Sequence, residues 1–301
     1  MLSLRALLID RQILTEHGSM NQSLEECLKN AKNHGVAVID IGIFREADHR
    51  KEIDTEEIKE GLERQGLSFR DCLMIADCEE SVRQAKTLGA AVLGYEPDGC
   101  GRIHSYPDMI VQGFEEIDLT FLMRVYRRFF GLPWDIVETD RCLVREMTLQ
   151  DLDALYELYR PQEVTRYLDS PDEDRQKEEV RLNDHIRCMY RFYGYGMWAV
   201  TEKTTGRLIG RAGFGHLQVK DEIMPELGYL IAADKQCRGY ATEVCRAILE
   251  YGWRELGFST VYCRVREENH ASVHLAEKLG FVQEKSVMEN GKVYLWCRTS
   301  K

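Results

Sequence analysis

The stretch ELGYLIAADKQCRGYATEV, residues 226–244, decides how the C-terminal half of this sequence folds. Its apolar start predicts a buried strand, and the periodic pattern from Tyr240 onward predicts a long helix, with only a tight turn between them. A helix that begins directly after such a turn leaves its first backbone N–H groups unpaired, and these donors together with the helix dipole favour an anion. Gly239 keeps the approach free of a side chain, and Arg238 adds a cation. The stretch therefore predicts a strand–turn–helix unit able to bind phosphate.

The spacing QxxGxA in this turn is by itself ambiguous, because a glycine used only for turn geometry explains it equally well. The hydrophobic periodicity of the flanking residues gives further evidence on the fold. It predicts strands at 142–147, 222–232, 259–268 and 292–299, helices at 149–160, 177–194, 240–257 and 270–280, and a hairpin at 196–217 that turns at 204–206. This order indicates an α+β domain with a mixed sheet.

The N-terminal half alternates strands and helices. Strands are predicted at 4–10, 36–44, 72–77 and 90–96, and helices at 23–35, 54–66, 80–89 and 118–131. Such alternation is typical of an α/β, Rossmann-like domain whose parallel sheet is covered on both faces. Residues 132–140 are expected to be a junction, because Gly131 and Pro133 end the last helix.

Composition limits the class of protein. A chain of 301 residues with 44% hydrophobic content can bury two compact cores. A formal net charge of −11 argues against partners that need a basic face, so neither nucleic acid nor a membrane is expected. Ten scattered cysteines without a CxxC pair indicate reduced thiols, and neither a signal peptide nor a membrane span is evident. We expect a soluble, cytoplasmic protein.

Residues from about 142 to 298 resemble the GCN5-related N-acetyltransferase (GNAT) superfamily. The resemblance lies in the QxxGxA turn, the preceding ELGYLIA and the later REENHASVHLAEKLGF, and it is strongest to the branch of ribosomal-protein N-terminal acetyltransferases. It implies that residues 140–301 form a GNAT domain that transfers an acetyl group from acetyl-coenzyme A to a primary amine. The acceptor would be a protein N-terminus or a small amine, attacking directly in a ternary complex.

The resemblance also implies where the cosubstrate lies, with its pyrophosphate on the turn and its pantetheine arm along the preceding strand. The cofactor-binding residues expected on this basis are Leu230, Ile231, Ala232, Gln236, Cys237, Arg238, Gly239, Tyr240, Ala241, Thr242, Asn269 and Ser272. Asn269 and Ser272 also suit capping of the final helix, and the two roles are compatible.

Glu226 is the predicted catalytic base. An amine is protonated at neutral pH and must lose that proton before it attacks a thioester. Glu226 lies two residues before Gly228 on the cofactor strand, and the matching glutamate is the proposed base in several relatives; the alternative is a surface glutamate. The tyrosine that many members use as the acid is replaced here by Ala276. His270 and His274 share a helix face without a third ligand, so no metal is expected there.

Residues 1–133 resemble the haloacid dehalogenase-like superfamily, through LLIDRQ and CLMIADCEESVRQAKTLGA. The resemblance implies a phosphatase ancestry in which Asp10 keeps the place of the nucleophile while Gln12 replaces the general acid. Asp10 and Asp77 together could still hold Mg²⁺ as a vestigial site. We therefore expect a degenerate domain that serves binding, regulation or dimerisation.

Two alternatives and one open question remain at this point. The chain could be a catalytically inactive protein that responds to coenzyme A, or a bifunctional protein with residual Mg²⁺-dependent phosphatase activity, which Gln12 argues against. A homodimer is left open. Asp172, Glu173 and Asp174 are expected to form a solvated loop, and they would suit a cationic amine if they faced the acceptor.

Overall fold

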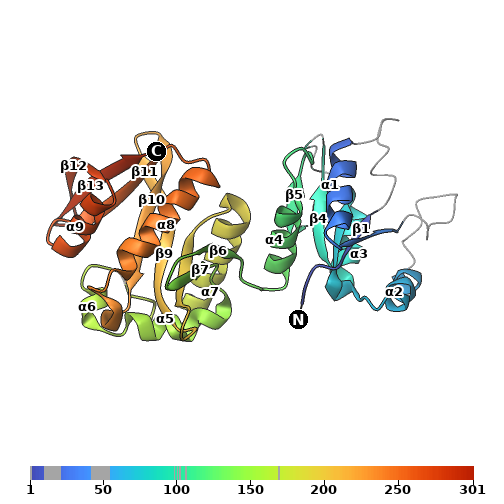
Figure 1. Ribbon diagram of the computed structural model, residues 1–301, viewed down its shortest axis with the longest axis horizontal. Coiled ribbons are helices and arrows are strands. Elements are labelled where there is room, and N and C mark those ends of the chain that lie inside the picture. Colours follow the sequence, from blue (N-terminus) through green and yellow to red (C-terminus); the bar gives the residue numbers. More distant parts are fainter. Residues whose placement is uncertain are drawn as a thin grey trace. The chain divides into compact units, whose positions relative to one another are not determined.

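The computed structural model describes residues 2–9, 22–41, 55–97, 99, 101, 103–105, 107–168 and 170–301. The chain forms two compact units, Met1–Leu132 and Pro133–Lys301 (Figure 1). None of the helices in the described ranges is long and apolar enough to cross a membrane.

The N-terminal unit contains a five-stranded parallel sheet in the order β2-β1-β3-β4-β5. Its strands are β1 (Ala6–Ile9), β2 (Ala37–Asp40), β3 (Cys72–Ala76), β4 (Ala91–Tyr95) and β5 (Met109–Val111). Its helices are α1 (Gln22–Asn33), α2 (Thr55–Arg64), α3 (Glu79–Thr87) and α4 (Leu119–Phe129). The predicted parallel sheet is confirmed.

Helices cover both faces of this sheet, as the continuous apolar runs of its strands require. Along β1, Leu7 and Ile9 pack with α1 and α4, whereas Ala6 and Leu8 pack with α2 and α3. Successive side chains of a strand point to opposite faces, so four consecutive apolar residues supply two separate cores.

The C-terminal unit contains an eight-stranded mixed sheet in the order β12-β13-β11-β10-β9-β8-β7-β6. The strands are β6 (Asp135–Glu138), β7 (Cys142–Arg145), β8 (Met197–Glu202), β9 (Leu208–Val219), β10 (Glu222–Ile231), β11 (Thr260–Arg266), β12 (Val282–Glu289) and β13 (Lys292–Ser300). All neighbouring pairs are antiparallel except β10 and β11, which are parallel because α8 connects them as a crossover.

Helices flank this sheet on its two faces. They are α5 (Leu152–Tyr159), α6 (Gln162–Thr165), α7 (Arg175–His185), α8 (Tyr240–Arg254) and α9 (His270–Lys278). One core joins α8 and α9 to the sheet, and another joins α5, α6 and α7 to it. A π-helical segment, Ile186–Tyr193, continues α7 and ends at Gly194, whose φ is 77°.

Three strands contradict the expectations from sequence. Residues 132–140 are not only a junction, because β6 forms within them and pairs with β7. Strands β5 and β12 are absent from the predicted elements, yet they pair with β4 and β13. All three are edge strands; β12 has no buried side chain and β5 is only three residues long, so no apolar alternation marks them.

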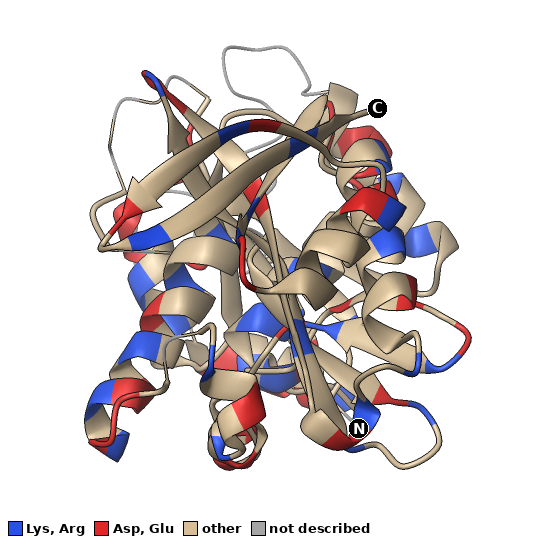
Figure 2. Cartoon of the chain, turned by 90° about the vertical axis from the view of Figure 1, so that its left-hand side faces the viewer, with Lys and Arg blue, Asp and Glu red and all other residues tan. Residues whose placement is uncertain are grey.

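Charged residues of both signs are interspersed over the described chain. In Figure 2 acidic and basic segments alternate along the helices, and no face in this view has a single sign.

Candidate active site

The turn between β10 and α8 exposes backbone donors. Gly239 caps α8 at its N-terminus with φ 82°, and Cys237 also has a positive φ of 56°. The first bond between helix residues runs from Glu243 N to Gly239 O, so the N–H groups of residues 240–242 have no partner within the helix. Because residues 236–239 are exposed, an anion can reach these donors.

Arg141, which directly precedes β7, contacts this turn through its guanidinium. Its guanidinium donates to Glu243 at 2.7 Å and to the carbonyl of Arg238 at 3.0 Å, and it lies 4.0 Å from the centre of the Tyr240 ring. Sequence analysis missed Arg141, because nothing in its own segment indicates that it contacts residues about a hundred positions later. The contacts fix the helix start without occupying the unpaired amides.

The buried carboxylate of Glu202, at the end of β8, forms hydrogen bonds with residues of the same turn. It accepts hydrogen bonds from Lys235 at 2.6 Å, from Tyr240 at 2.7 Å and from Thr205 at 2.9 Å. These bonds, that from Lys235 first, lower the pKa of Glu202 to about 2. The carboxylate is therefore ionised at neutral pH and keeps Lys235 directed inward, away from the exposed face of the turn.

Strands β10 and β11 separate at the centre of the sheet. Their pairing is limited to Glu226 opposite Tyr262, whereas β10 remains paired with β9 as far as Ile231. One edge of β10 beyond Glu226 is thus left without a neighbouring strand. An extended ligand arm can pair with such an edge through backbone groups.

The register shows which backbone groups face the opening. Ala232 N donates to Ile209 O, so Ala232 and, by alternation, Leu230 bond to β9. Tyr229 and Ile231 face the other way. The backbone groups of Leu230 and Ala232, which were predicted to bind pantetheine, are therefore used by β9, whereas those of Ile231 and of Tyr229, which was not predicted, face the opening.

Besides Tyr240, three predicted cofactor residues have side chains that form hydrogen bonds within the protein. Gln236 donates to the carbonyl of Ile231 at 3.0 Å and so closes the end of β10. The side chain of Asn269 accepts from Ser272 N at 3.2 Å and caps α9, as its alternative role required. The Ser272 hydroxyl accepts a hydrogen bond from Tyr229 at 2.7 Å, which links α9 to β10 across the opening.

Glu226 lies in the middle of the sheet and not at an edge. Arg264 of β11 binds its carboxylate through two nitrogens, at 2.7 Å and 3.2 Å, and also contacts Glu289 at 3.4 Å. The Glu226 side chain is 17% exposed, so water or a substrate can reach it. The ion pair holds the carboxylate in place beside the point where β10 and β11 separate.

The acidic loop does not form an open patch. Asp174 caps α7 by accepting from Gln176 N at 3.0 Å, and Asp172 accepts from the Asp174 amide at 2.9 Å. Because these bonds cap the N-terminus of α7, residues 172–174 form the start of that helix. The exposed His274 contacts Glu277, and no group of three metal-binding side chains occurs in the described parts of the chain.

The C-terminal unit has counterparts among known proteins. The family model described as an acetyltransferase (GNAT) domain matches residues 141–282. An uncharacterised N-acetyltransferase of Bacillus subtilis, YoaA, is 30% identical over 163 residues, which span 53% of this chain and 92% of the relative. The chain belongs to the GNAT acetyltransferase family. Spermidine N(1)-acetyltransferase of Vibrio cholerae is 27% identical over 149 residues, 48% of this chain and 82% of the relative.

A solved structure agrees with the fold of the GNAT domain. A GNAT-family acetyltransferase from Bordetella pertussis superposes with a TM-score of 0.50 at 23% identity, over 56% of this chain and all of that protein. The protein is thus an N-acetyltransferase, and acetyl-coenzyme A is its acetyl donor. The unpaired amides of α8 and the open edge of β10 suit the phosphates and the amide-bearing arm of that donor.

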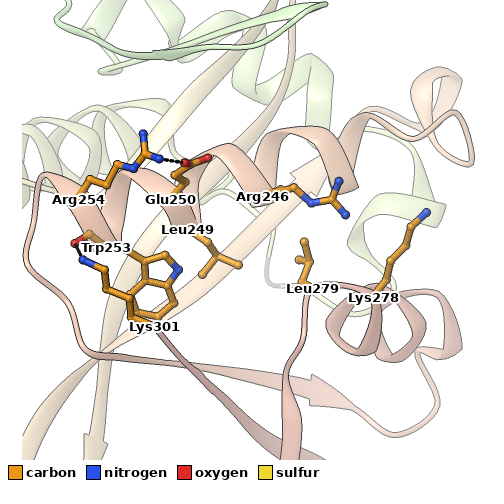
Figure 3. Close-up of a pocket in the computed structure, with 8 residues that line it drawn as sticks. All are labelled: Arg246, Leu249, Glu250, Trp253, Arg254, Lys278, Leu279 and Lys301. Carbon is orange, nitrogen blue, oxygen red and sulfur yellow. Dashed lines mark hydrogen bonds and ion pairs between the residues drawn. The ribbon is translucent and has the colours of Figure 1, made fainter.

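A hollow of about 310 Å³ lies along α8 of the GNAT domain (Figure 3). It is lined by Arg246, Leu249, Glu250, Trp253, Arg254, Lys278, Leu279 and Lys301. Its one carboxylate, Glu250, is held by Arg254 at 2.6 Å. The lining of this hollow offers neither an unpaired carboxylate nor the backbone donors of a helix start.

The phosphatase-like site predicted in the N-terminal unit lies only partly within the described residues. Asp10 and Gln12 lie outside the described residues, and Asp77 directly follows β3. A Mg²⁺ site formed by Asp10 and Asp77 therefore stays a prediction.

His185 provides a pH-dependent contribution to the stability of the GNAT domain. Burial, followed by the positive charge of Arg211, lowers the pKa of His185 to about 4. Since an unfolded histidine has a pKa of about 6.5, the unfolded chain binds more protons between pH 6.5 and 4, and stability falls as the pH drops through this range. The loss should reach about 3 kcal/mol at pH 4.

His185→Gln is expected to flatten this dependence in urea unfolding followed between pH 7 and 4. The matched variant His274→Gln changes an exposed histidine and should leave the slope as it is. An unchanged slope in His185→Gln would show that other groups cause the acid sensitivity.

Proposed function

We propose that the C-terminal unit acetylates a primary amine, either a protein N-terminus or a small amine, by direct attack in a ternary complex. The observation that carries this proposal is the opening of β10 from β11 at Glu226, which leads directly to the unpaired amides of α8. Only there does the described chain place a carboxylate, an unpaired strand edge and an anion-binding helix start along one path. The polyamine substrate named for the Vibrio cholerae relative makes a small amine one class to test.

Each element has a distinct role in this proposal. The N–H groups of residues 240–242 would hold the pyrophosphate of the donor, and the outward-facing backbone of Tyr229 and Ile231 would pair with its pantetheine arm. The donor supplies an activated thioester. Glu226, directly or through water, would take the proton of the attacking amine, while Arg264 keeps the carboxylate in position.

The leaving thiolate needs little help from the protein. Ala276 stands where many relatives have a tyrosine, and it is buried. The Tyr229 hydroxyl lies near the opening, but burial raises its pKa, so it holds its proton firmly at neutral pH. Because a thiolate is only a moderate base, water can protonate it.

Release of coenzyme A in the presence of an amine library tests the proposal. The library should contain polyamines, aminoglycosides and peptides with free N-termini, and mass spectrometry should identify the acetylated product. We expect amine-dependent release together with an added acetyl group on the acceptor. Binding of coenzyme A without any acetylation would favour the alternative of a catalytically inactive, coenzyme A-responsive protein.

We further propose that the N-terminal unit is a degenerate dehalogenase-like domain that binds or regulates and does not hydrolyse. Its parallel sheet supports this proposal, as does Gln12 in the place of the general acid. A glutamine cannot donate a proton to the leaving group, which removes about two to four orders of magnitude of rate.

We accordingly expect no Mg²⁺-dependent release of phosphate from small phosphoesters by the full chain. Gln12→Asp restores the missing acid and is the informative comparison, because any activity that it gains would show an otherwise intact site. Turnover by the native chain that disappears in Asp10→Asn would contradict the proposal.

A further inference from the structure

Arg211 is a half-buried cation without a direct counterion. It lies on β9, opposite Ala199 of β8 and Leu230 of β10. Its one hydrogen bond in the described residues goes from Nη1 to the Tyr159 hydroxyl at 3.2 Å, and its Nε is buried with no partner. No carboxylate of the described chain lies within 4.0 Å of its guanidinium.

Two other arginines of this sheet are paired with carboxylates. Arg145 binds Asp151 at 2.7 Å, and Arg264 binds Glu226 at the same distance. Removing a guanidinium from water without such a partner is unfavourable, and its planar set of donors matches a carboxylate. Arg211 therefore has unused capacity to bind an anion.

The groups around Arg211 do not supply that anion. His185 and Tyr190 are close enough for Arg211 to affect their titration, and both are neutral at pH 7. The buried carboxylate of Glu146 also acts on Tyr190, but it lies beyond contact distance of Arg211. Because Arg211 remains partly exposed, a ligand can complete its hydrogen bonds.

Arg211 faces the same side of the sheet as Glu226. In the register of β9 and β10, Arg211 lies opposite Leu230, Gly213 opposite Gly228, and residue 215, also glycine, opposite Glu226. Directly opposed residues share a face, and alternate residues along a strand return to it. Glycines thus occupy this face between the two charged residues, over four residues or about 13 Å of strand. Gly213 is buried with the carbonyl of Gly196 against it, so the accessible part of the floor lies at Gly215 and Gly228.

One side chain borders this floor. The sulfur of Met197 lies 3.4 Å from the position that a Cβ at Gly228 would occupy, and Met197 pairs with Gly213. Methionine is flexible and adapts to ligands of different shape. Backbone floor, Met197 and the two charged ends together define a strip long enough for a short chain molecule.

We propose that Arg211 binds a carboxylate on the acceptor, so that the preferred acceptor is a primary amine with a carboxylate several bonds away, such as a short peptide or an ω-amino acid. The proposal rests on the function proposed above, since it takes the amine to lie at Glu226. It makes Arg211 a residue that determines specificity and gives it no part in the chemical step. The amine end would meet Glu226 while the carboxylate end meets the free donors of Arg211.

Matched acceptors test the proposal. We would compare kcat/KM for 6-aminohexanoate with that for 6-aminohexanamide, and for a tripeptide acid with that for its amide, in the native protein, Arg211→Gln and Arg211→Lys. The native protein should prefer the acids about tenfold or more, and Arg211→Gln should lose the preference while retaining activity on the amides. Arg187→Gln, which changes an exposed arginine of the π-helical segment, is the control and should keep the preference.

A binding measurement keeps the result independent of turnover. The melting temperature of the native protein should rise with 6-aminohexanoate but not with 6-aminohexanamide, and Arg211→Gln should show no rise with either. Equal use of acids and amides by the native protein, or an equal preference in Arg211→Gln, would overturn the role of Arg211. Failure to acetylate any amine would contradict the proposed function, and the melting temperatures would still decide whether Arg211 binds the carboxylate.

Discussion

Glu226→Gln is expected to lower kcat for acetyl transfer by about two to four orders of magnitude and to leave the affinity for acetyl-coenzyme A unchanged. Glutamine keeps the size of the side chain and one oxygen for Arg264, but it cannot take a proton from the amine. The backbone of β10 and the start of α8, which would hold the donor, do not depend on the carboxylate. Steady-state kinetics together with calorimetric titration of coenzyme A separate the two effects.

Glu289→Gln is the matched control. Glu289 also contacts Arg264, at 3.4 Å, so this variant perturbs the same guanidinium while retaining the carboxylate of Glu226. We expect a change of less than about threefold in kcat, as for an exposed ion pair. Equal losses in the two variants would show that Glu226 acts by positioning Arg264, and full activity in Glu226→Gln would remove it from the mechanism.

Gly239→Val is expected to weaken coenzyme A binding by at least about tenfold, because each hydrogen bond to a charged group contributes about 1.5–3 kcal/mol. At φ 82° a β-branched residue is strained, and its side chain would stand before the unpaired amides of α8. The nearest protein atom to the new Cβ, Arg141 Nη2, is 3.5 Å away, so the side chain has room without displacing the arginine.

Gly257→Val controls for strain alone. Gly257 has φ 67°, no atom lies within 4 Å of the position that a Cβ there would occupy, and it follows α8 at the end remote from the turn. Both valine variants should lower the melting temperature by a similar amount, whereas only Gly239→Val should lose affinity for coenzyme A in calorimetry. Equal affinities in the two variants would show that the phosphates are bound elsewhere.

Much of the fold could be predicted from periodicity. The parallel N-terminal sheet and the mixed C-terminal sheet follow from runs of apolar residues whose buried faces are continuous in sequence. Strands β5, β6 and β12 escaped prediction because they are short or exposed edge strands, whose pairing no side-chain pattern reveals. A tertiary neighbour was required to make them strands.

In the candidate site, too, some features could be predicted from the sequence and others could not. The glycine-capped start of α8 is local, since a turn residue and a helix start are adjacent in sequence, and the stretch 226–244 was sufficient to locate it. The support from Arg141 and Glu202 depends on contacts between distant segments and had no sequence signal. The same applies to the ion pair that Arg264 forms with the proposed base.

By itself, then, the sequence determined most of the order of elements and the glycine-capped start of α8, because these depend on residues close together in the chain, and its resemblance to the GNAT superfamily implied the acetyl donor. Only the tertiary structure decided which backbone groups of β10 are available, since the register with β9 assigns Leu230 to the sheet and leaves Tyr229 free. It also left Arg211 without a counterion, a property set by the three strands and two helices around it. Which charged side chains lie next to one another depends on the tertiary structure, and the order of residues in the chain does not reveal it.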